Sequence, residues 1–153
     1  MGEAVVVIGV GNTDRGDDGV GHQVVSHLEG GVAPGVRLVT ATGADPATLI
    51  EAWRDADTVI LIDAMVSDAR PGTVERFDVA AGPLPESVHL VSTHALGATA
   101  AIEMARALGR LPSRFAVYGV EGSDFGFGDG LGPAAAAAAT IATEMILEEL
   151  AES

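Results

Sequence analysis

The sequence contains no cysteine. A chain without thiols has no disulfide framework, no thiolate metal site and no cysteine nucleophile. Histidine, aspartate and glutamate therefore remain as its only strong metal ligands.

Basic residues are scarce as well, with eight Lys and Arg against 22 Asp and Glu and a formal net charge of −14. Phosphate backbones and anionic lipids are attracted by clustered Lys and Arg. We therefore expect neither nucleic acid nor a membrane as a partner. The acidity favours cationic or metal-bearing partners.

Long hydrophobic runs are also missing. The chain opens on the acidic tripeptide Met1-Gly2-Glu3, and its first apolar run stops at Ile8, which is not the pattern of a signal peptide. The weakly polar stretch 132–146 is Ala-rich, is interrupted by Thr and Glu, and is shorter than the roughly 20 apolar residues of a membrane span. We therefore expect a cytoplasmic protein.

What the chain does contain is enough apolar material for one core. Its 153 residues are 48% hydrophobic, a size at which a chain buries about 68 to 70% of its unfolded surface. No internal repeat or long linker divides it. We predict a single domain over residues 1–153.

The pattern of apolar runs predicts an α/β fold. The runs at 4–8 and 58–62 do not alternate with polar residues, which is typical of parallel strands covered on both faces. Two further strands are predicted at 36–39 and 115–120, and an alternating edge strand at 73–79. Helical patterns lie between them, at 20–28, from Asp45-Pro46 onward, at 96–108 and at 133–150, the last with Ile141, Met145 and Leu150 among its apolar positions. Together they predict a three-layer sandwich, a mostly parallel twisted sheet of about five strands with helices on both faces.

Ligands of such sheets bind beyond the carboxyl ends of the strands. The loop at 9–21 follows the first strand and holds five glycines and three aspartates, and Asp63 follows the apolar run that ends at Ile62. Gly9 and Gly11 begin a G-x-G-x-x-G motif, but Asp14 stands where the third glycine should be. Acidic side chains there would repel a pyrophosphate, which argues against a dinucleotide.

Each candidate residue also has a purely structural interpretation. One of Asp17 and Asp18 could cap the helix while the other is solvated. Asp63 could form a turn, or it could be a desolvated carboxylate that needs a partner, a hydrogen-bond network or a metal.

The four histidines divide in the same way. His22 and His27, five residues apart, are expected on the surface, and His89 is expected to pack in an apolar patch. His94 precedes a helix, where a capping or solvent role would by itself be the better interpretation.

Taken in order, several motifs resemble those of the hydrogenase maturation proteases, the endopeptidases that trim nickel-iron hydrogenase large subunits. The resemblance covers nearly the whole chain. Its motifs are Gly9-Val10-Gly11-Asn12, Gly16-Asp17-Asp18-Gly19-Val20-Gly21, Leu61-Ile62-Asp63-Ala64, Ser92-Thr93-His94-Ala95-Leu96-Gly97, Tyr118-Gly119-Val120-Glu121 and Gly130-Leu131-Gly132-Pro133.

This resemblance implies a cytoplasmic endopeptidase that removes a C-terminal extension from a hydrogenase large-subunit precursor after nickel insertion. It implies that Asp18, Asp63 and His94 are the catalytic and metal-contacting residues. The nickel would arrive with the substrate, no other cofactor is expected, and a monomer is favoured. One departure is that Thr40-Ala41-Thr42-Gly43 stands where the family usually has an acidic residue after its second strand.

Two other functions remain open at this point. The chain could be a domain that binds a metallated partner without hydrolysis, or a nucleotide-binding α/β protein. A Ser or Cys nucleophile is not supported, because the sequence has no cysteine and no G-x-S-x-G motif.

Overall fold

The computed structural model describes residues 4–42, 45–91, 97–128 and 130–152. They form a six-stranded sheet in the order β2-β1-β3-β6-β4, with the short β5 paired to β3. β1, β2, β3 and β6 are parallel, whereas β4 and β5 are antiparallel to their neighbours. The elements are β1 (Val5–Val10), the short 3-10 helix η1 (Gly16–Gly19), α1 (Val20–Leu28), β2 (Val36–Ala41), α2 (Pro46–Ala52), β3 (Thr58–Val66), β4 (Val74–Asp78), β5 (His89–Leu90), α3 (Ala98–Ala107), β6 (Arg114–Glu121) and α4 (Pro133–Glu152).

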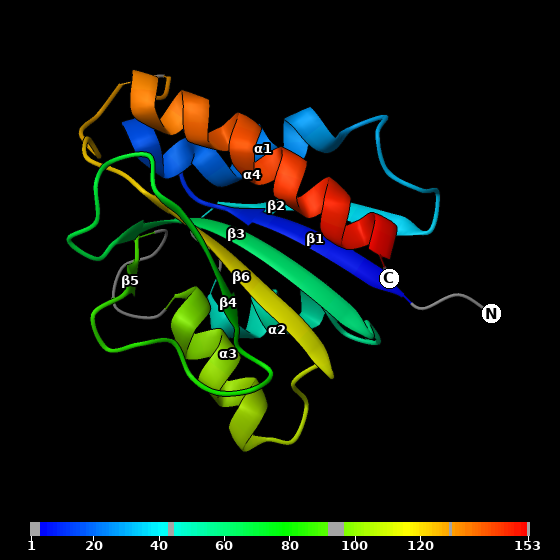
Figure 1. Ribbon diagram of the computed structural model, residues 1–153. Helices are drawn as coiled ribbons and strands as arrows, with labels where there is room; N and C mark the ends of the chain where they lie inside the picture. The colour runs from blue at the N-terminus through cyan, green and yellow to red at the C-terminus, as the bar shows by residue number, and fades with distance from the viewer. Residues whose placement is uncertain (1–3, 43–44, 92–96, 129, 153) are drawn as a thin grey trace.

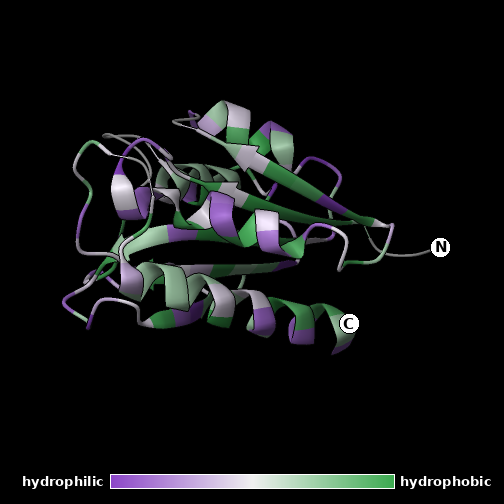
Figure 2. Cartoon of the chain, turned by 90° about the horizontal axis from the view of Figure 1, so that it is seen from above, coloured by the Kyte–Doolittle hydropathy of each residue, from purple (hydrophilic) through white to green (hydrophobic). Residues whose placement is uncertain are grey.

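The helices cover both faces of this sheet, so the predicted three-layer architecture is confirmed. Helices α1 and α4 pack on one face and α2 and α3 on the other (Figure 1). Two buried apolar clusters correspond to the two interfaces. In Figure 2 the strands of the middle layer are mainly green, and the purple, hydrophilic residues lie mostly in the helices and loops. No helix in the described ranges is long and apolar enough to cross a membrane.

Local sequence signals place several elements correctly. The Asp45 side chain accepts a hydrogen bond from the Thr48 backbone N–H at 2.8 Å, and Pro46 occupies the first turn of α2. Helix α1 has the predicted bounds, and β4 is the predicted edge strand, which the structure shows to be antiparallel to β6.

Three expectations are wrong. Strand β3 continues past Ile62 to Val66, so Asp63 lies inside a strand rather than after it. His89 is exposed, because the neighbouring Val88 is the residue that enters the core. Ile141, expected among the apolar positions of α4, is 49% exposed, because α4 packs through its alanine face instead.

Candidate active site

Two glycines bring helix α1 unusually close to the sheet. A Cβ atom on Gly9 would lie 2.2 Å from the Gly21 carbonyl oxygen, and one on Gly21 would lie 2.6 Å from the Ile62 carbonyl oxygen. Both distances are shorter than any stable contact, so only glycine fits at either position. This packing places η1, which directly precedes α1, against β3 at the carboxyl edge of the sheet.

Asp17, in η1, is a structural residue. It is 3% exposed, and its carboxylate accepts backbone N–H groups from Ser123 at 2.9 Å, Asp124 at 3.2 Å and Gly132 at 2.9 Å. Burial raises the pKa of Asp17, but these donors outweigh it and hold the pKa below its usual value. Asp17 therefore fastens the loop after β6 to the loop after β1.

Asp18 is equally buried, at 5% exposure, but its carboxylate is only half satisfied. Its Oδ2 accepts the Asn12 backbone N–H at 3.2 Å, whereas its buried Oδ1 has no hydrogen-bond partner among the described residues. Burial raises the pKa of Asp18, and the Asn12 N–H and the charges of His22 and Arg15 offset this only in part. Such a group gains from a cation, which would supply the missing partner and favour the ionised form.

Asp63 lies at the same edge. It is fully buried, and it follows Ile62, the last residue of β3 that pairs with β1. On its other side it is in register with Gly119 of β6. Asp63 is therefore the first residue of β3 beyond its pairing with β1, at a point where pairing with β6 continues, on the strand that η1 contacts.

His94 lies outside the described residues, so the predicted trio is placed only in part. No group of three His, Asp or Glu that could hold a metal occurs within the described ranges. The chain leading toward His94 does start at this edge, because the Val91 backbone N–H donates to the Ala64 carbonyl at 3.0 Å, one residue from Asp63.

Comparison with known proteins concerns the chain as a whole. The family model described as "HycI: Hydrogenase maturation protease" matches residues 22–149. The chain belongs to the hydrogenase maturation protease family. The protease is thus an endopeptidase and a hydrolase, which decides against the two alternative functions.

Individual relatives agree. The hydrogenase expression/formation protein HupD of Thiocapsa roseopersicina is 29% identical over 97% of this chain and 68% of its own length. The solution structure of an endopeptidase from Escherichia coli matches with 26% sequence identity and a TM-score of 0.77. The match covers 97% of this chain and 92% of the E. coli chain. The hydrogenase maturating endopeptidase HybD from E. coli superposes with a TM-score of 0.76 at 23% identity, over the same shares of the two chains, and supports the fold.

Sequence reasoning missed two residues that shape the site of the protease. His22, expected on the surface, is half-buried, and its Nε2 donates to the Gly11 carbonyl at 2.9 Å and lies 3.3 Å from the Ala41 carbonyl. It therefore links the loop after β1 to the end of β2, beside the Thr40 position. Of the two histidines of α1, His22 and His27, only His27 is exposed as expected.

Glu121, the last residue of β6, is the second. It is 4% exposed, and its two carboxylate oxygens accept the Ser67 hydroxyl at 2.6 Å and the Ser67 backbone N–H at 3.0 Å. It thereby fixes the turn that follows β3. Like Asp17, Glu121 has donors on both carboxylate oxygens, whereas Asp18 has a donor on one only.

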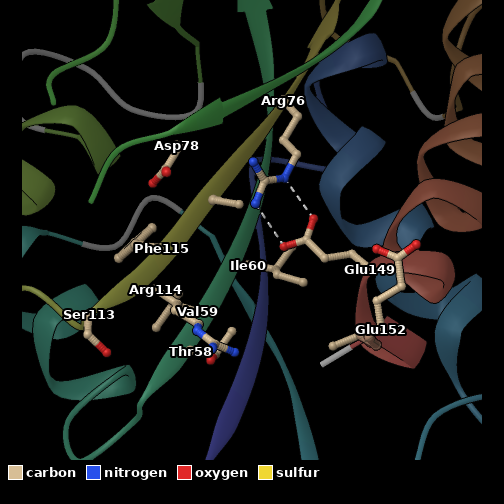
Figure 3. A pocket seen from close by; sticks show the side chains of 12 residues that line it. Thr58, Val59, Ile60, Arg76, Asp78, Ser113, Arg114, Phe115, Glu149 and Glu152 are labelled. Carbon is tan, nitrogen blue, oxygen red and sulfur yellow. Dashed lines mark hydrogen bonds and ion pairs between the residues drawn. The ribbon is translucent and has the colours of Figure 1, made fainter. Parts of the chain in front are cut away.

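A pocket of about 260 Å³ lies at the opposite edge, beside the first residues of β3 and β6. Figure 3 shows the Arg76 guanidinium held by the Glu149 carboxylate, at 2.8 and 3.1 Å. The Tyr118 hydroxyl also donates to Glu149. The pocket is therefore separate from the candidate active site. The ion pair between Arg76 and Glu149 supports the packing of α4 on the sheet.

Proposed function

We propose that this protease removes a C-terminal extension from the large-subunit precursor of a nickel-iron hydrogenase once nickel has been inserted. In this proposal Asp18, Asp63 and His94 contact the nickel carried by the precursor. The observation that carries it is the buried Asp18 carboxylate, whose Oδ1 lacks a hydrogen-bond partner among the described residues at the edge where Asp63 is also buried.

The donor set suits a metal that arrives with its substrate. Carboxylates and imidazole bind nickel without thiolates, but a zinc protease commonly holds its ion with three protein ligands fixed by second-shell hydrogen bonds, often from an H-E-x-x-H helix. This chain has no such motif. The carboxylates and imidazole of this site therefore bind a free ion weakly. They bind more tightly to an ion that already has ligands from the precursor.

Contact with the nickel also aligns the bond to be cut. Hydrolysis adds water across one peptide bond and yields a new carboxylate on the large subunit and a free amine on the released extension. Holding the nickel-bearing segment at Asp18 and Asp63 would fix the scissile carbonyl relative to that water, which accounts for much of the rate enhancement in enzymes. It would also restrict cleavage to precursors that carry the metal.

The test compares nickel-loaded with nickel-free precursor, using purified protease and a chelator that removes free metal. We expect cleavage of the loaded form only, followed as a shift in the mass of the large subunit. Equal cleavage of both forms would contradict the proposal.

Asp63→Asn tests the carboxylate itself. It preserves the shape of the side chain but removes its charge, so we expect loss of processing with little change in folding. The matched control is Ile60→Ala, which opens a cavity and costs on the order of 2 to 5 kcal/mol of stability. A fully active Asp63→Asn protein would exclude a required carboxylate at this position.

A further inference from the structure

An aromatic ring stands in solvent close to the candidate active site. Phe127, in the loop between β6 and α4, is 83% exposed, more than any other large hydrophobic residue in the described ranges. A lone exposed apolar side chain is ordinary on a protein surface, but an aromatic ring that the fold holds in place is a candidate for contact with a partner.

The loop that carries Phe127 is fixed rather than loosely attached. Before Phe127 in the chain, the backbone N–H of Asp124 donates to the Asp17 carboxylate. Directly after Phe127, the Gly128 N–H donates to the Asp14 carbonyl at 2.9 Å, and the Gly128 carbonyl accepts the Gly16 N–H at 3.1 Å. Phe127 is therefore held against segment 14–18, the segment that contains Asp18.

Arg15 holds the ring itself. Its guanidinium carbon lies 4.2 Å from the centre of the Phe127 ring, within the range of a cation–π contact. The positive charge of Arg15 also acts on Asp18, whose pKa it lowers in part. Arg15 thus connects the exposed ring to the buried carboxylate, while most of the ring surface stays open.

We propose that Phe127 binds an apolar side chain of the precursor in the segment next to the scissile bond, with Arg15 as a positioning residue for the ring. This rests on the proposed function. A ring fixed before binding loses little conformational freedom, which is why rigid aromatic residues dominate the energetics of many interfaces. The precursor segment is the expected occupant because the ring and Asp18 share one anchored stretch of chain.

The experiment measures cleavage of nickel-loaded precursor by Phe127→Ala and Phe127→Tyr. For the alanine variant we expect KM to rise about tenfold, equivalent to about 1.4 kcal/mol, with kcat within about twofold of the parent. The tyrosine variant keeps the ring and should restore KM. Leu108→Ala is the matched control, because Leu108 is 59% exposed just after α3, outside the site.

Several results would overturn the inference. They are an unchanged KM in Phe127→Ala, an equal rise in Leu108→Ala, or a tyrosine variant as impaired as the alanine one. A parent protein that dimerises through Phe127, seen as a smaller particle on size exclusion of Phe127→Ala, would show that a second copy covers the ring. If the parent protease leaves loaded precursor uncut, the proposed function fails, whereas an active parent with an indifferent Phe127 refutes the docking contact alone.

Discussion

Two adjacent carboxylates of η1 should respond in opposite ways to the same substitution. Asp17→Asn leaves one acceptor oxygen and one NH2 group where the carboxylate now serves three backbone N–H donors. Oδ1 accepts Gly132, and Oδ2 accepts both Ser123 and Asp124. In either orientation of the amide, the NH2 group faces at least one N–H donor.

The magnitude follows from the number of bonds lost. A hydrogen bond to a charged group contributes about 1.5 to 3 kcal/mol, and one or two of the three are removed. We therefore expect Asp17→Asn to lower the free energy of unfolding by about 2 to 5 kcal/mol. For a domain of this size, a loss of about 3 kcal/mol lowers Tm by roughly 6 to 12 °C.

Asp18→Asn should leave stability within about 1 kcal/mol of the parent or raise it. Burial already disfavours the charge of Asp18, and the asparagine oxygen can still accept the Asn12 N–H. Processing, in contrast, should be lost. The pair therefore separates a carboxylate that holds the fold from one that we propose contacts the substrate.

The assay is equilibrium unfolding in urea, followed by the fluorescence of Trp53, the single tryptophan, which is buried against Phe115. The pKa of Asp17 is lowered on folding, so the ionised carboxylate stabilises the folded state. This stabilisation is fully present above the ordinary pKa of 3.8 and is lost as the pH falls through the lowered pKa. The stability difference between parent and Asp17→Asn should thus shrink from pH 5 to pH 3. Equal stability of Asp17→Asn and the parent at pH 7, or an equal loss in Asp18→Asn, would refute this assignment.

Two other perturbations test the packing around the site. Gly21→Ala would place a methyl group 2.6 Å from the Ile62 carbonyl oxygen. We therefore expect the free energy of unfolding to fall by about 1 to 3 kcal/mol or more, and processing to be reduced. Gly35→Ala is the control and should leave both unchanged, because the space around Gly35 is open. Burial and the hydrogen bond to Glu149 raise the pKa of Tyr118, the single tyrosine, so an absorbance titration should detect no phenolate near pH 10, and Glu149→Gln should lower that pKa. Ordinary titration of Tyr118 would show that this contact does not form in solution.

Features that depend on neighbouring residues were predictable from the sequence. The β-branched runs without alternation specify buried parallel strands, and Asp45-Pro46 specifies the start of α2, because capping acts over three residues. The order of strands and helices then determines the layers. The ordered motifs along nearly the whole chain indicated the family, and family membership is confirmed by comparison.

Features that depend on distant residues were decided only by the tertiary structure. Asp17 and Asp18 are identical neighbours in sequence, and their roles differ because the donors to Asp17 come from residues more than 100 positions away. His22 bonds to the ends of two strands that only the sheet brings together. The trio with His94 stays a prediction, since His94 lies outside the described residues. A side chain's type and its immediate neighbours set its local conformation, but its protonation and its partners depend on which segments the fold places around it.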